Sequence, residues 1–131
     1  MDNASIKLPP EYSHLTDWFW DIISKAHEDK AALREILLPM DRDDILRFQE
    51  QFIDAAVELQ DEPFTDYMES SEDGIEDISH WIVSKGKAYY ADIINHPEKV
   101  PHSVFGNTKT ILNGVADDVF EEKYGESTGI Y

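Results

Sequence analysis

A long acidic stretch with no fixed positive charge is the part of this sequence whose residue types could do chemistry. No Lys or Arg lies between Arg47 and Lys85. The eleven carboxylates of this stretch are Glu50, Asp54, Glu58, Asp61, Glu62, Asp66, Glu69, Glu72, Asp73, Glu76 and Asp77. Carboxylates could act as acids or bases in catalysis, ligate a cation or attract a basic protein. Because the stretch supplies no cation of its own, it indicates a positively charged partner.

Three of these acids are spaced so that they would line up on a helix. Glu50, Asp54 and Glu58 follow one another at intervals of four, and each neighbouring pair of like charges destabilises a helix by roughly 0.2–0.5 kcal/mol. The acids at positions 72–77 differ, because a serine N-cap before them would make them complementary to the dipole of a helix. The row formed by Glu50, Asp54 and Glu58, which we call the acidic column, has no comparable stabilising partner within its own helix. We therefore predict a protein-binding surface formed by Glu50, Asp54, Glu58, Asp61 and Glu62.

Patterns typical of enzymes and of metal sites are missing from the sequence. The five histidines are dispersed, and none forms an i,i+4 pair that could place two ligands on one helical face. Residues 69–74 resemble the opening of an EF-hand loop, but the position of the bidentate carboxylate would be His80. Neither a phosphate-binding glycine loop nor a serine elbow is present. We therefore expect a protein that is not an enzyme, has no catalytic residues and binds no metal or cofactor.

Composition narrows the class of partner. The 131 residues include 28 acidic and 11 basic side chains, for a formal net charge of −17. This charge disfavours attraction to nucleic acid or to an anionic membrane surface. The absence of cysteine excludes a disulfide framework and a thiolate metal site. No secretory signal and no stretch of membrane-spanning length is apparent, so we expect a cytoplasmic protein with a basic protein as its partner.

The apolar residues predict the elements that would position these side chains. Residues 1–14 are predicted as an extended arm, and residues 15–131 as a single helical domain. Thr16, Asp29 and Asp41 are predicted N-caps. The longest helix is predicted over about 42–60, where apolar residues recur every three or four positions. Since no period-two alternation occurs, we predict an all-α fold of six or seven helices packed around this long central helix.

An aromatic trio near the start of the first helix has two interpretations. Trp18, Phe19 and Trp20 are consecutive, and a helix cannot bury three consecutive side chains on one face. We predict that Trp18 is partly exposed. It would then be either a binding anchor for a partner or a lid over the arm at Pro9 and Pro10.

Two functional alternatives to an acidic binding surface remain open. A small enzyme or ligand-binding domain would require a pocket near His80, Trp81, Tyr89 and Tyr90. A scaffold without specific activity would use its acids only to stay in solution.

One segment resembles the signature of a known family. Trp81-Ile82-Val83-Ser84-Lys85-Gly86-Lys87-Ala88-Tyr89 is similar to the Trp-Leu-Ile-x-x-Gly-Arg-x-x-Tyr/Phe pattern of a bacterial family known as domain of unknown function 4240. The resemblance runs from Trp18 to Gly125 and includes Phe19-Trp20, Ser71-Glu72-Asp73-Gly74, Pro97 and Val119-Phe120-Glu121-Glu122-Lys123-Tyr124-Gly125.

The chain also departs from this pattern. The family's Phe-x-x-Phe-Arg before the tryptophan is replaced here by Ile75, Ile78 and Ser79, and its Glu after Gly-Arg is replaced by Ala88. If that Arg and Glu carry a family activity, this chain lacks it. The resemblance therefore implies a helical fold and leaves the function open.

Charge, size and missing motifs together favour an acidic protein-binding module. Complementary charge accelerates association and selects partners. We predict a regulatory or immunity-type protein, for example one that neutralises a basic toxin such as a nuclease.

Overall fold

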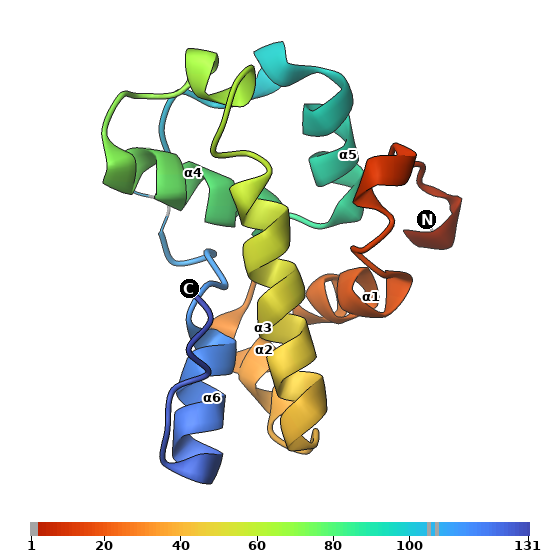
Figure 1. Cartoon of the computed structure of the whole chain (residues 1–131), viewed down its shortest axis with the longest axis vertical. Helices are drawn as coiled ribbons and strands as arrows, with labels where there is room; N and C mark the ends of the chain where they lie inside the picture. The colour runs from red at the N-terminus through yellow and green to blue at the C-terminus, as the bar shows by residue number, and fades with distance from the viewer. Residues whose placement is uncertain (1–2, 105, 107) are drawn as a thin grey trace.

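Helices make up the regular structure of this protein. The computed structural model describes residues 3–104, 106 and 108–131, and this part of the chain contains six α-helices and no strand (Figure 1). The all-α prediction is therefore confirmed. None of the described helices is long and apolar enough to cross a membrane. The helices are α1 (Asp17–Ala26), α2 (Lys30–Leu37), α3 (Arg42–Val57), α4 (Glu72–Ser84), α5 (Lys87–Asn95) and α6 (Val115–Tyr124).

The starts of the first three helices are set by the predicted caps. The Thr16 side chain accepts a hydrogen bond from the backbone N–H of Phe19 at 3.4 Å. Asp29 accepts from the N–H of Ala31 at 2.8 Å, and Asp41 accepts from the N–H of Asp44 at 2.9 Å. Each cap satisfies a backbone donor that has no partner within its helix.

The central helix ends earlier than predicted. α3 stops at Val57 instead of near residue 60. The N–H groups of Leu59 and Gln60 bond to carbonyls three residues back, those of Ala56 and Val57. This tighter turn redirects the chain before Pro63, so Glu58 lies at the C-cap of α3 and not within its last turn.

The core surrounds α3, which passes through the middle of the molecule (Figure 1). Phe48 and Phe52 of α3 are buried against Phe19 of α1, with ring centroids 5.2 and 6.4 Å from that ring. α3 also contacts α4 and α6, while α2 bridges α1 and α6. Because one face of α3 is buried, its opposite face is exposed to solvent, and this exposed face carries the predicted acidic column.

The N-terminal residues lie against the helices instead of forming an extended arm. Within the described part of the predicted arm over 1–14, 3-10 turns form at Asn3–Ser5 and Pro10–Tyr12, and residues 1 and 2 are outside the described residues. The buried Lys87 donates from Nζ to the carbonyl of Asn3 at 2.9 Å and to Asp17 Oδ1 at 3.1 Å. A buried ammonium needs such acceptors, so it ties this segment to α1 and α5.

Replacing Lys87 with methionine is expected to loosen the N-terminal segment. The variant keeps an apolar side chain of similar length but loses the hydrogen bonds from Lys87 to Asp17 and to the buried Asn3 carbonyl, which retains its bond from the Ile6 N–H. This loss is expected to cost about 1–3 kcal/mol. Hydrogen exchange measured by mass spectrometry should show faster exchange over residues 3–15. Lys30→Met, at an exposed site of α2, is the control. Unchanged exchange in K87M would contradict this role for Lys87.

Candidate functional site

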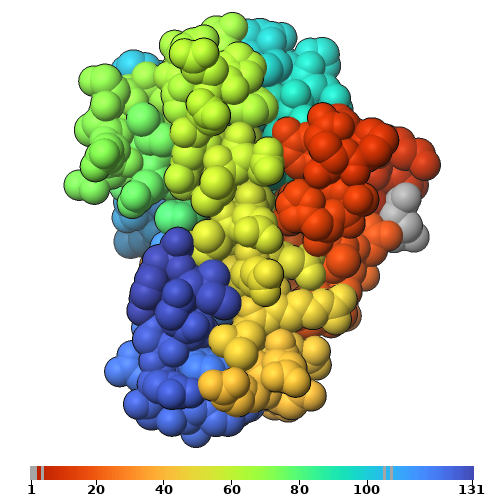
Figure 2. All heavy atoms as spheres, viewed as in Figure 1, coloured from red at the N-terminus to blue at the C-terminus, as the bar shows by residue number. Residues whose placement is uncertain are grey.

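The predicted acidic column faces solvent. Glu50, Asp54 and Glu58 are exposed, as are Asp61 and Glu62. Figure 2 shows the yellow and yellow-green surface of α3 and the following turn running across the middle of this face. Within residues 3–104, 106 and 108–131, none of these five carboxylates forms an ion pair.

Arg47, the basic residue nearest to the acidic column in sequence, contacts an aromatic ring instead of an acid within the described residues. The guanidinium of Arg47 lies 4.2 Å from the centroid of the Trp18 ring, a cation–π contact between α3 and α1. Trp18 is partly exposed, as predicted, and it packs against the core with the guanidinium of Arg47 over its ring. The structure therefore places Trp18 beside the start of the column and leaves its role as a binding anchor a prediction.

A hollow of about 430 Å³ opens at the C-terminal end of α3. Three of the five predicted acids lie together here, while Glu50 and Asp54 lie outside it on α3. We call this site the acidic hollow, and its lining residues are Tyr12, Val57, Glu58, Asp61, Glu62, Pro63, Phe64, Ile94 and Pro97. Three carboxylates, no Lys or Arg and several apolar side chains line it, so it favours a cation with an apolar stem.

Two aromatic residues give the acidic hollow its apolar surface. Tyr12 and Phe64 are buried side chains that line it. Burial, followed by the charges of Glu58 and Glu11, raises the pKa of the Tyr12 hydroxyl above its ordinary value. Sequence reasoning missed both residues. Each comes from a segment distant from α3 or beyond its end, and no spacing rule links them to the acids.

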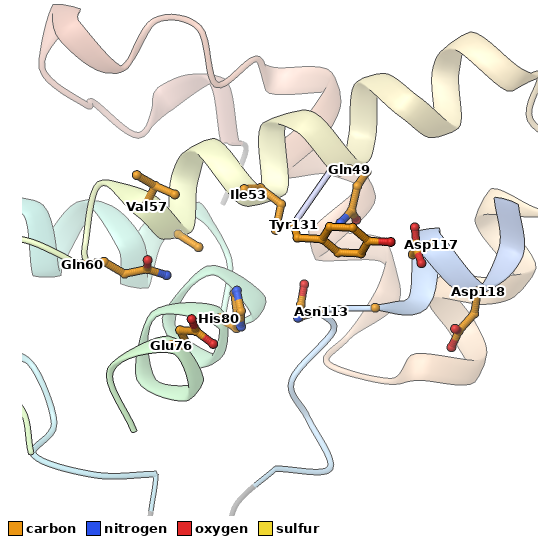
Figure 3. Close-up of a pocket in the computed structure, with 12 residues that line it drawn as sticks. Gln49, Ile53, Val57, Gln60, Glu76, His80, Asn113, Asp117, Asp118 and Tyr131 are labelled. Atoms are coloured by element: carbon orange, nitrogen blue, oxygen red, sulfur yellow. The ribbon is translucent and has the colours of Figure 1, made fainter. Parts of the chain in front are cut away.

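A second hollow, which we call the His80 pocket, lies between α3, α4 and the start of α6 (Figure 3). Its volume is about 300 Å³. The lining residues are Gln49, Ile53, Ala56, Val57, Gln60, Glu76, His80, Asn113, Gly114, Asp117, Asp118 and Tyr131. It shares only Val57 with the acidic hollow.

A pocket forms at His80, as predicted, but the other predicted residues, Trp81, Tyr89 and Tyr90, do not line it. Trp81 instead packs edge to face on Tyr89, with centroids 5.7 Å apart. Tyr90 is buried and donates its hydroxyl hydrogen to the carbonyl of Ala55 at 2.8 Å. Successive residues of a helix point about 100° apart, and on α4 it is His80, not Trp81, that lines the pocket.

His80 is a neutral side chain in this pocket. Burial lowers the pKa of its imidazole to about 4, because the charged form loses hydration. The ring lies 5.9 Å from the centroid of the Phe52 ring. At neutral pH the imidazole therefore offers one donor and one acceptor nitrogen.

Tyr131 lines one side of the His80 pocket, and hydrogen bonds hold the preceding residues, 127–130, against α3 and α6. Asp117 Oδ1 accepts hydrogen bonds from Thr128 N at 2.9 Å, Thr128 Oγ1 at 2.6 Å and Ser127 Oγ at 3.0 Å. Gln49 Nε2 donates to the carbonyl of Ile130 at 2.8 Å. Although burial acts to raise it, these hydrogen bonds from Thr128 and Ser127 hold the pKa of Asp117 below its ordinary value. No local sequence signal predicts these long-range contacts.

The His80→Gln variant is expected to lose less stability than the wild type as the pH falls. The unfolded imidazole binds a proton near pH 6.5, whereas the folded one does so only near 4. The folded state therefore has its full stability above pH 6.5, and it loses stability as the pH falls toward 4, because the unfolded state binds the proton first. At about 1.4 kcal/mol per pKa unit, the wild type should lose about 2 kcal/mol more than H80Q between pH 7 and 4.5.

Urea unfolding at the two pH values measures this difference. Carboxylates titrate in both proteins, so their contribution cancels in the comparison. Equal losses in the wild type and in H80Q would show that His80 does not titrate with a lowered pKa.

The loop that resembles an EF-hand opening acts as a helix cap. Ser71 Oγ accepts from the N–H of Gly74 at 3.1 Å, which starts α4, and Ser71 Oγ–H donates to Glu69 Oε1 at 2.8 Å. Glu72 and Asp73 occupy the first turn, where acids complement the helix dipole. In the part of the chain that the structure describes, no group of three His, Asp or Glu side chains is arranged to hold a metal ion.

Comparison with known proteins identifies one relationship. A family model described as "Protein of unknown function (DUF4240)" matches residues 15–124, which is most of the 131 residues. No curated protein and no solved structure matches the chain. The family resemblance inferred from the Trp81–Tyr89 segment is therefore confirmed.

Proposed function

Since the chain belongs to the DUF4240 family, whose function is unknown, we propose from its own surface that it is a cytoplasmic binding protein for a basic partner. The contact surface consists of Glu50, Asp54, Glu58, Asp61 and Glu62. The observation that carries the proposal is the acidic hollow, in which three exposed carboxylates without ion pairs in the described part of the chain surround buried apolar side chains.

The chemistry of the hollow fits a lysine or arginine side chain. The aliphatic stem of such a side chain would pack on Phe64, Ile94 and Pro97, and its charged end would meet the carboxylates. A volume of about 430 Å³ falls within the usual range of ligand pockets, roughly 300–1,000 Å³. The hollow therefore supplies both the apolar and the charged contact that a cationic anchor needs.

The remaining acids of the column extend the negative electrostatic potential beyond the acidic hollow. Glu50 and Asp54 are exposed residues of α3, the helix that Glu58 caps at its C-terminal end. The net charge of −17 adds a long-range attraction for a positively charged protein. An immunity protein that blocks a nuclease toxin would use such a surface, because an active site that binds phosphates is itself cationic.

Capture from the native cell tests this function. The wild type and a variant with Glu58, Asp61 and Glu62 changed to lysine serve as baits in cell extract, and captured proteins are quantified by mass spectrometry. We expect the wild type to retain a basic protein that the variant loses by about tenfold or more, because a cationic anchor would meet three like charges.

A matched variant separates the effect of charges inside the acidic hollow from the effect of the total charge of the protein. Reversing Glu35, Asp43 and Glu121, which are exposed and line neither hollow, changes the net charge by the same amount. This control bait should retain the partner. Equal capture by all three baits, or capture of no basic protein by the wild type, would contradict the proposed function.

A further inference from the structure

The His80 pocket is a second concave site with its own chemistry. It is smaller and more enclosed than the acidic hollow, and residues from three helices and Tyr131 line it. A mostly preformed concavity with an apolar wall and a few convergent polar groups is the usual form of a small-molecule site.

One wall of this pocket is apolar. Ile53, Ala56 and Val57 project from successive turns at the end of α3. Val57 is 53% exposed, so the wall continues to the mouth. A ligand that fills the pocket therefore needs an apolar body.

The opposite side carries negative charge and no positive charge. Glu76 and His80 are four residues apart on α4 and lie next to each other in the pocket (Figure 3). Glu76 is exposed and forms no ion pair within the described residues. Asp117 and Asp118 add two more carboxylates, although Asp117 Oδ1 is occupied by Thr128 and Ser127. Since the lining contains no Lys or Arg, an anionic ligand is disfavoured.

Tyr131 and His80 supply further contacts suited to a cation. Tyr131 is 80% exposed at the edge of the pocket, and Figure 3 shows its ring above Asn113. An aromatic face attracts an ammonium group. The neutral imidazole of His80, whose pKa is lowered by burial, does not repel a cation and can accept an N–H hydrogen bond.

We propose that the His80 pocket binds a primary alkylammonium ion, with the charged end at Glu76 and His80 and the apolar body against Ile53, Ala56 and Val57. The ammonium could belong to a free amine or to a lysine side chain, and the recognition chemistry is the same. This site does not depend on the proposed binding of a basic partner at the acidic hollow.

Titration of the nitrogen-15-labelled full chain with benzylamine, followed by NMR, tests the proposal. We expect saturable shifts of the amides of His80, Asn113 and Gly114. Benzyl alcohol, which has nearly the same shape without the charge, should bind roughly fivefold or more weakly, and benzoate should cause no shifts at these residues.

Two variants locate the charged end of the ligand. Glu76→Gln should weaken benzylamine binding roughly two- to fivefold, the range for an exposed ion pair, whereas Glu121→Gln, outside the pocket, should leave it unchanged. Asn113→Lys places an ammonium inside the pocket and should abolish the shifts. The same change at Asn95, which is exposed and lines neither hollow, is the matched control.

The source of the ammonium is distinguished with two more probes. Nα-acetyl-lysine amide represents a lysine in a polypeptide, and n-butylamine represents a free amine. Equal binding of both would identify a site open to protein side chains, and binding of n-butylamine alone would identify a site for free amines. The proposal is overturned if benzylamine causes no saturable shifts, if benzyl alcohol or benzoate binds as tightly, or if N113K leaves binding unchanged.

Discussion

Reversal of Glu50, Asp54, Glu58, Asp61 and Glu62 to lysine is expected to slow association with the basic partner by about ten- to a thousandfold at low salt. Electrostatic steering accelerates encounter by factors of this size, and the variant replaces attraction with repulsion at the C-terminal half of α3 and in the turn that follows it. Stopped-flow or surface-based kinetics at low ionic strength measures the association rate.

The two parts of this surface are expected to affect different rate constants. Glu50 and Asp54 lie outside the acidic hollow, so reversing only these two should lower the association rate and leave dissociation nearly unchanged, as for charges at an interface rim. Reversing Glu58, Asp61 and Glu62 should also accelerate dissociation, because these residues contact the anchor. If dissociation responded equally to both variants, the hollow would have no special role in binding.

Phe52→Ala is expected to lower the free energy of unfolding by about 3–5 kcal/mol, the usual cost of truncating a buried phenylalanine. Phe52 is almost fully buried. Its ring lies 6.3 Å from Phe48 and 6.4 Å from Phe19, and 5.9 Å from His80. It therefore joins α1 and α3 to the α4 wall of the His80 pocket.

Urea unfolding measures the stability effect, and NMR titration of His80 measures its consequence at the pocket. Burial is what lowers the pKa of His80, so the cavity left in F52A should admit water and raise that pKa toward its ordinary value. Tyr67→Ala, at a side chain that is 43% exposed, should change stability by only about 0.5 kcal/mol. A loss below about 1 kcal/mol in F52A would show that Phe52 does not join these helices.

The helical framework could be predicted because its signals are local. A cap such as Thr16 or Asp41 bonds to a backbone N–H three residues away, so sequence spacing alone reveals it. The apolar period of α3 likewise assigned its buried and exposed faces, and with them the exposure of the acidic column. The end of α3 was less predictable, because the tighter turn at residues 58–60 depends on how the chain continues toward Phe64.

The concave sites could not be predicted because they are formed by distant segments. Tyr12 reaches the acidic hollow from the N-terminal segment, and Tyr131 reaches the His80 pocket from the other end of the chain. Neighbours in sequence were also misleading, since His80 lines a pocket while Trp81 packs on Tyr89. Three of the five predicted acids, Glu58, Asp61 and Glu62, do lie together in the acidic hollow, because they are close in sequence, and the lack of Lys and Arg around them is visible in the sequence.

The salt dependence of association is the most direct test of the claim that the acidic surface binds a basic partner. The rate constant for the wild type and its captured partner is measured from low to high ionic strength, alongside the variant with Glu58, Asp61 and Glu62 reversed. We predict that the wild-type rate falls by about tenfold or more as salt screens the attraction, and that the variant shows a flat or inverted dependence. Identical and salt-independent rates for the two proteins would mean that these acids only keep the protein in solution.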